Sequence, residues 1–159
     1  MIQRIQSAWL LLAAIASMLL FVLPIATFSI EGIAFFKFYT YGLDYADPFT
    51  AQLEMLYRPF MKYSILLAAL VATVIPVLTI FLYKNRSRQM YLSRLTILLN
   101  VVLLVVFFLL SDSFAETTQS TSKYGVACYL PIFSIIMLFL AIRGIKKDEN
   151  TVRSADRIR

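Results

Sequence analysis

Residues 5–30 read IQSAWLLLAAIASMLLFVLPIATFSI, a run of 26 positions without a charged side chain. About 20 apolar residues in an α-helix are enough to span the hydrocarbon core of a bilayer. A charge at the centre of such a helix costs roughly 2.5 to 3.5 kcal/mol on insertion scales, so uncharged runs of this length are typical of lipid-embedded segments. We therefore expect a membrane-spanning helix over about residues 7–29.

Three further uncharged runs follow this one, at Tyr63–Tyr83, Leu95–Ser111 and Tyr124–Ile142, with 21, 17 and 19 residues. The Leu95–Ser111 run is short, but its helix can extend if Arg94 reaches back to the headgroups. The whole chain is 60% hydrophobic and 15% charged, whereas a soluble domain is roughly 25% charged. The sequence predicts an all-α membrane protein with a single domain, residues 1–159, built as a bundle of four transmembrane helices at about 7–29, 61–83, 91–111 and 124–142.

The first run has an alternative interpretation as a cleaved secretory signal. Arg4 precedes it, and the small residue Ala26 lies near its end. Its apolar core exceeds the 7 to 15 residues of a typical signal, and it lacks a clear A-x-A cleavage site. We therefore expect an uncleaved membrane anchor.

The distribution of lysine and arginine predicts the orientation, because short loops rich in these residues stay in the cytoplasm. Of the 15 basic residues, 11 lie in the N-terminal segment, the loop between the second and third spans, and the C-terminal tail: Arg4, Lys84, Arg86, Arg88, Arg94, Arg143, Lys146, Lys147, Arg153, Arg157 and Arg159. The other two loops hold four basic residues and six acids. We expect both termini in the cytoplasm (N-in/C-in). The net charge of +6 then follows from topology and predicts attraction to anionic lipid headgroups on the cytoplasmic side, not nucleic-acid binding.

The predicted periplasmic loop, residues 31–62, is unusually aromatic. Ile33–Tyr41 is rich in aromatic and β-branched residues, and Gly42 with Asp44 can end it, which predicts a short strand or one arm of a β-hairpin. Asp47 followed by Pro48 is typical of the start of a helix, and apolar residues recur after it at helical spacing, which predicts a short amphipathic helix.

Two roles are open for this loop. It can fold as an aromatic cap in the headgroup zone, which we favour, or act as a docking surface for another envelope protein; the two roles are compatible. The candidate partner surface comprises loop residues and three residues of the tail: Phe35, Phe36, Phe38, Tyr39, Tyr41, Tyr45, Phe49, Leu53, Tyr57, Arg153, Asp156 and Arg157.

The remaining segments outside the spans carry weaker signals. The second outer loop, Asp112–Lys123, is polar and predicts a plain connector. The cytoplasmic tail, residues 143–159, mixes both charge signs, so it is either disordered or a short helix on the membrane surface or on a partner.

The residues needed for most enzyme chemistry are missing. The chain has no histidine, a single cysteine at Cys128, and no acid inside a predicted span, and its four glycines form no phosphate-binding cluster. We expect no catalytic, cofactor-binding or metal-binding residues and no cofactor. Outer-loop acids such as Asp44, Asp47 and Asp112 would support catalysis only if they converged in one pocket.

Asn100 is the one strongly polar side chain at membrane depth. An asparagine in a span more often joins helices through a hydrogen bond than binds a solute. We therefore predict a helix–helix contact at Asn100, with a solute site as the alternative.

The two ends of the chain carry a family resemblance. The opening MIQRIQ (residues 1–6) with LLLAAIASM (10–18), the four-span layout, and KKDEN (146–150) followed by VRSADRIR (152–159) resemble Bacteroidota four-helix membrane proteins catalogued as a domain of unknown function. The resemblance implies the topology and the inner membrane of a diderm bacterium. That family carries no established catalytic or ligand-binding residues, so no site is implied.

These observations favour a non-catalytic accessory or assembly subunit of a larger envelope complex, with other membrane proteins as partners. The alternative is a small lipid-handling or solute-transporting helix bundle, which would need a cavity around Asn100.

Overall fold

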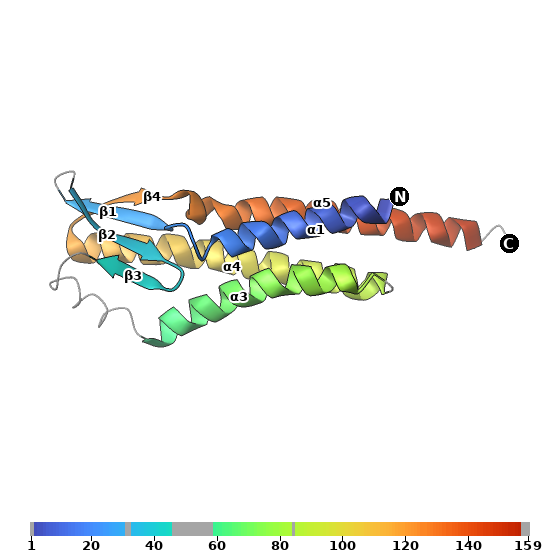
Figure 1. Ribbon diagram of the computed structural model, residues 1–159, viewed down its shortest axis with the longest axis horizontal. Coiled ribbons are helices and arrows are strands. Elements are labelled where there is room, and N and C mark those ends of the chain that lie inside the picture. Colours follow the sequence, from blue (N-terminus) through green and yellow to red (C-terminus); the bar gives the residue numbers. More distant parts are fainter. Residues whose placement is uncertain (1, 31–32, 46–58, 84, 157–159) are drawn as a thin grey trace.

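The computed structural model of the chain describes residues 2–30, 33–45, 59–83 and 85–156. These residues form four helices and one four-stranded antiparallel sheet (Figure 1). In chain order the elements are α1 (Ile2–Leu19), β1 (Ala26–Ile30), β2 (Ile33–Tyr39), β3 (Gly42–Tyr45), α3 (Pro59–Phe81), α4 (Arg86–Thr118), β4 (Thr121–Tyr124) and α5 (Val126–Asp156).

The helices lie side by side along the long axis of the molecule (Figure 1). The sheet is at one end, and both termini lie toward the other; we call these the sheet end and the termini end. Helix α1 packs against α5 and α3, and α4 packs against α5 and α3. Helix α1 begins at the termini end, and β1 follows it at the sheet end. Helix α1 therefore runs along the bundle beside the three longer helices.

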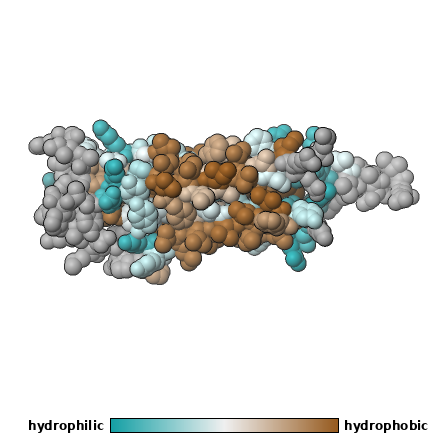
Figure 2. Space-filling view, viewed as in Figure 1, coloured by the Kyte–Doolittle hydropathy of each residue, from teal (hydrophilic) through white to brown (hydrophobic). Residues whose placement is uncertain are grey.

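Three helices are long and apolar enough to cross a membrane, at Phe60–Phe81, Arg86–Thr118 and Val126–Thr151. Large apolar side chains point outward from all the helices, including Met18, which is 65% exposed, and Leu67, which is 63% exposed. Figure 2 shows a hydrophobic band across the middle of the molecule, with hydrophilic residues on both sides of it. An outer surface of this kind is suited to lipid rather than to water.

The first predicted helix, 7–29, is wrong at its end. Helix α1 stops at Leu19, and β1 occupies Ala26–Ile30 within the same uncharged run. Pro24, which has no N–H to continue a helix, lies between them, and the backbone pairs with other strands directly after it. The N–H of Ile25 donates to the carbonyl of Phe38 at 2.7 Å, and β1 then pairs with β2 and β4.

Two of the other three helices extend well beyond the predicted spans. Helix α3 agrees with the prediction of 61–83 to within two residues at each end, but α4 continues past 111 to Thr118 and α5 continues through most of the predicted tail to Asp156. Charged residues mark the edge of an apolar run, and they do not end a helix, since its backbone hydrogen bonds continue in water. Helix α4 ends where Gln119 adopts a left-handed conformation with φ of 51°.

The predicted strand at Ile33–Tyr41 is confirmed as β2, and the hairpin continues into β3. Tyr39 pairs with Gly42 across a two-residue turn. Gly42 has φ of +148°, a conformation that glycine adopts without strain. The predicted amphipathic helix after Pro48 falls among residues 46–58, outside those that the structure describes.

The sheet has the strand order β3-β2-β1-β4. Strand β4 comes from the predicted plain connector, so that prediction is wrong: Thr121–Tyr124 pairs antiparallel with β1. The sheet therefore joins the segment after α1 to the segment before α5, which are about 90 residues apart in the chain.

Candidate functional site

The inner face of the sheet carries an aromatic cluster. Alternate residues of a strand point to the same face, and Phe28 of β1 with Phe36 and Phe38 of β2 all point toward the bundle. Phe28 and Phe36 are cross-strand neighbours that stack with ring centroids 4.4 Å apart. Phe114 of α4 meets Phe38 edge to face at 5.4 Å and Phe28 at 6.2 Å. These contacts fix the sheet to α4.

This cluster corrects the predicted partner surface. Phe36 and Phe38 are 2% and 0% exposed, so another protein cannot contact them. The alternation Phe36-Lys37-Phe38, apolar then charged then apolar, is the pattern of a strand with one buried face. This pattern could have shown from the sequence that Phe36 and Phe38 are buried.

Tyr39 and Tyr41, by contrast, lie near the surface. Their rings stack with centroids 5.1 Å apart, and Tyr41 is 48% exposed. The turn between them is joined to the segment that directly follows α1, since the buried hydroxyl of Thr40 donates to the carbonyl of Leu20 at 2.6 Å. The pKa of Tyr41 is raised by partial burial, by Tyr39 and by the charge of Asp44. The pair is thus a rigid aromatic surface at the hairpin tip.

The outer face of the sheet is polar. Cross-strand pairing aligns one residue from each strand in a row, in the order Lys123, Thr27, Lys37 and Asp44. Both lysines and Asp44 are exposed. The sheet is therefore amphipathic, with phenylalanines toward the bundle and charges outward.

The acids that could have supported catalysis do not converge among the described residues. Asp112 accepts a hydrogen bond from the hydroxyl of Tyr124 at 2.6 Å, beside β4. Asp44 lies on β3, at the opposite edge of the sheet, three strand spacings or about 14 Å across. The hydrogen bond to Asp112 raises the pKa of Tyr124, as do partial burial and the carboxylate charge. Asp47 lies outside the described residues.

Inside the bundle, α4 has a polar buried face. Its buried polar residues are Gln89, Ser93, Thr96, Asn100 and Ser111, and the first four recur at steps of four, three and four, which places them on one side of a helix. Three oxygens on this face have no hydrogen-bond partner among the described residues: Ser93 Oγ, Asn100 Oδ1 and Ser111 Oγ. We call the five buried polar residues together the polar face of α4.

Asn100 is fully buried in the bundle, but its described hydrogen bond stays within its own helix. Its Nδ2 donates to the carbonyl of Thr96 at 2.9 Å. Bonds between helices are made by other residues. Gln89 Nε2 donates to the carbonyl of Thr79 in α3 at 2.9 Å, and Ser17 of α1 lies 3.5 Å from Ser134 of α5 between the hydroxyl oxygens. Sequence reasoning missed Gln89, because it lies outside every uncharged run.

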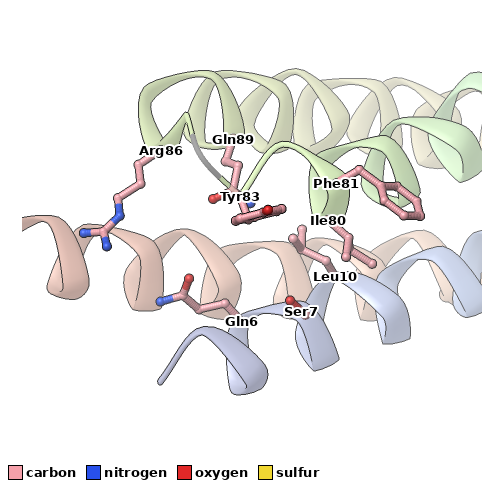
Figure 3. Close-up of a pocket in the computed structure, with 8 residues that line it drawn as sticks. All are labelled: Gln6, Ser7, Leu10, Ile80, Phe81, Tyr83, Arg86 and Gln89. Atoms are coloured by element: carbon pink, nitrogen blue, oxygen red, sulfur yellow. The ribbon is translucent and has the colours of Figure 1, made fainter. Parts of the chain in front are cut away.

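A pocket of about 460 Å³ opens at the termini end, next to this polar face. Figure 3 shows that Gln6 and Arg86 lie on one side of it, and Leu10, Ile80 and Phe81 on the other. The remaining lining residues are Ser7, Tyr83 and Gln89. Gln89 thus belongs both to the pocket lining and to the polar face of α4.

The pocket combines hydrogen-bonding groups with an apolar wall. Among the described residues no group of three or more His, Cys, Asp or Glu could hold a metal ion. The pocket offers one guanidinium, amides, hydroxyls and an apolar wall, which suit an amphiphile. The other predicted surface residues, Phe35, Tyr45, Phe49, Leu53, Tyr57, Arg153, Asp156 and Arg157, have side chains outside the described set.

The three long apolar helices, with a small amphipathic sheet at one end, are compatible with a helical membrane protein. The chain belongs to the family described as a domain of unknown function (DUF4293), whose model matches residues 2–158. This confirms the family resemblance noted in the sequence. No curated protein matches the chain. No solved structure matches it.

Proposed function

We propose that the chain crosses the inner membrane of a diderm bacterium four times, with both termini in the cytoplasm and the sheet in the periplasm. The apolar band and the three long helices support insertion. The fourth crossing is supported by α1, which packs along α5 and reaches the sheet end with the other helices. The orientation is supported by the basic residues gathered at the termini end.

Cysteine labelling tests this topology. In a Cys128→Ala background, Lys123→Cys places a thiol at the exposed outer face of the sheet and Arg88→Cys places one at the exposed start of α4. A membrane-impermeant maleimide should label position 123 in intact spheroplasts and position 88 only after permeabilisation. The reverse pattern would contradict the orientation, and equal labelling of both would contradict insertion.

We further propose that the protein is a non-catalytic accessory or assembly subunit of an envelope complex. One observation carries this proposal: the sheet is fixed to the bundle by the phenylalanine cluster and holds the Tyr39–Tyr41 pair at the surface. Tyrosine on a rigid support supplies contact area at low entropic cost and is enriched where proteins meet. Tyr41 then marks the centre of the partner contact.

Site-specific photo-crosslinking in cells tests the partner surface. A photoreactive phenylalanine derivative at Tyr41 should give a discrete crosslinked protein band. The matched control is the same group at Lys123, on the edge strand at the opposite side of the same sheet. Equal bands at both positions, or none at Tyr41 together with a monomeric purified protein, would overturn the proposal.

A second candidate function, handling of a lipid or another solute, is favoured by the pocket and the polar face of α4. The pocket meets this face at Gln89, and the next oxygens along the face, at Ser93 and Asn100, have no hydrogen-bond partner in the described part of the chain. The variant Asn100→Leu separates the two functions. Loss of transport with a normal crosslink at Tyr41 favours the second function, and loss of the crosslink with normal folding favours the first.

A further inference from the structure

A second groove lies at the termini end, between α4 and α5. It has a volume of about 460 Å³ and is lined by Arg94 and Ile97 from α4 and by Phe139, Ile142, Arg143 and Lys146 from α5. It thus combines three cationic side chains with three apolar ones. No acid is among the described residues that line it.

The groove lies at the point where both helices change from apolar to charged. On α4, Arg94 directly precedes the uncharged run Leu95–Ser111, and on α5, Arg143 directly follows the run that ends at Ile142. Arg94 and Arg143 line the same groove, so the two changes lie at a similar depth along the bundle. In the proposed topology this depth is the cytoplasmic headgroup layer.

Helical spacing arranges the lining by depth. Phe139, Arg143 and Lys146 follow at steps of four and three, so they lie along one side of α5. Ile97 lies one turn from Arg94 on α4, toward the middle of the bundle. The cations therefore lie at the outer edge of the groove, and the apolar side chains lie deeper along the bundle.

We propose that this groove binds one anionic phospholipid, with its phosphate held by Arg94, Arg143 and Lys146 and its acyl chains along Ile97, Phe139 and Ile142. Guanidinium groups bind phosphate through paired hydrogen bonds, and basic pockets between transmembrane helices are suited to anionic headgroups. The headgroup of a zwitterionic lipid would place a fourth cation beside the three cationic side chains. This inference rests on the proposed membrane topology.

Native mass spectrometry of the full-length protein tests the proposal. The protein is purified from nanodiscs that hold equal amounts of phosphatidylglycerol and phosphatidylcholine. We expect phosphatidylglycerol to be retained selectively. The double variant Arg94→Gln with Arg143→Gln removes one cation from each helix and should weaken this retention about 30-fold, at a typical contribution for two basic residues near a membrane surface.

The matched control is Arg88→Gln with Lys147→Gln. It also removes one cation from each of α4 and α5 at the same end, but neither residue lines the groove. It should retain the lipid as the wild type does. Equal losses in both variants would show a general charge effect and overturn the groove as a site, and retention of phosphatidylcholine as strong as that of phosphatidylglycerol would overturn the anionic specificity.

One further variant and one competition measurement complete the test. The Phe139→Ala variant keeps all three cations and should also lose lipid, because the acyl chains lose their apolar support; unchanged retention would overturn the lipid assignment. Inorganic phosphate at millimolar concentration should not displace the lipid, and displacement would show a site for phosphate alone. The labelling of Lys123→Cys and Arg88→Cys reports the topology separately, so a failure of the groove is distinguishable from a failure of the proposed orientation.

Discussion

Replacing Gly125 with alanine should loosen the sheet from the bundle. Gly125 joins β4 to α5, and its N–H donates to the carbonyl of Ile25 at 2.8 Å. A Cβ at this position would lie 2.3 Å from the carbonyl oxygen of Pro24, whereas ordinary contacts begin at 3.4 Å. The backbone at position 125 would have to move about 1 Å away from the backbone of Pro24 and Ile25, because the nearest atoms are all backbone atoms and none belongs to a flexible side chain.

The expected cost follows from two contributions. Forcing an extra methyl group into a packed site costs about 1–3 kcal/mol, and weakening the hydrogen bond from Gly125 to Ile25 adds roughly 1 kcal/mol. We expect local destabilisation of about 3 kcal/mol, which corresponds to a loss of roughly 100-fold in amide protection.

Hydrogen exchange followed by mass spectrometry measures this loss in the peptides that contain β1 and β4. The matched control is Gly144→Ala in α5, where the nearest atom is Cγ of Gln6 at 3.0 Å, part of a flexible side chain that can move. In the Gly144→Ala variant, β1 and β4 should exchange as in the wild type. Unchanged exchange of β1 and β4 in Gly125→Ala, or equal changes in both variants, would refute the argument from close approach.

Three further predictions concern the core and the sheet. The Asn100→Leu variant should be as stable as the wild type or more stable by up to about 2 kcal/mol in thermal unfolding, because it removes a buried carbonyl oxygen that has no hydrogen-bond partner within the described ranges; a loss above about 1 kcal/mol would contradict this. The Phe114→Ala variant should lose about 3–5 kcal/mol and expose β1 and β2 to exchange, since Phe114 supports both Phe28 and Phe38; intact protection would show that the cluster does not hold the sheet. The raised pKa of Tyr124 means that its bond to Asp112 stabilises the fold below about pH 10, and that this contribution is lost as the pH rises through the raised value; ultraviolet titration should show one late-titrating tyrosine fewer in Tyr124→Phe than in the wild type, with the late titration of Tyr41 retained, and identical titrations would contradict this.

The helices were predictable from the sequence because their apolar segments are long runs without a charged residue. A charge inside hydrocarbon is costly, so uncharged runs of sufficient length locate the segments that lie in the apolar band. The same rule carries no information about helix ends. Helix α4 continues beyond Asp112 and Glu116 to Thr118, and α5 continues beyond Lys146, because a helix has no need to end where its apolar run ends.

The sheet was only partly predictable. The aromatic and β-branched composition of Ile33–Tyr39 indicated β2, but Ala26–Ile30 is equally apolar in a helix or a strand, and it stood inside an uncharged run. Strand β4, Thr121–Tyr124, resembles a polar loop, and it is a strand because β1 lies beside it. Pairing between segments so far apart in the chain leaves no local signal.

The polar face of α4 was also found only in part. Asn100 stands out as the one amide in an uncharged run, whereas Gln89 lies among charged residues and is buried only because α3 supplies the carbonyl of Thr79. The grooves at the termini end depend on which helices are neighbours. Helix order cannot be read from one hydropathy pattern, so the meeting of Arg94 with Arg143 and Lys146 was outside the reach of sequence reasoning.

The sheet and the bundle share one register, and this gives β4 a structural role beyond a connection. Ala26 pairs with Tyr124 in the sheet, Ser17 lies beside Ser134 between the helices, and Gln6 lies beside Gly144 near the termini. The two residue numbers add up to 150 or 151 in each pair, so the antiparallel alignment of β1 with β4 continues without a slip into α1 with α5. Gly125 stands at the junction of the two. A shift of the strands at Gly125 must therefore disturb either the packing of α1 against α5 or the pairing of β1 with β4. We expect the strand pairing to give way, because it extends over only four residue pairs.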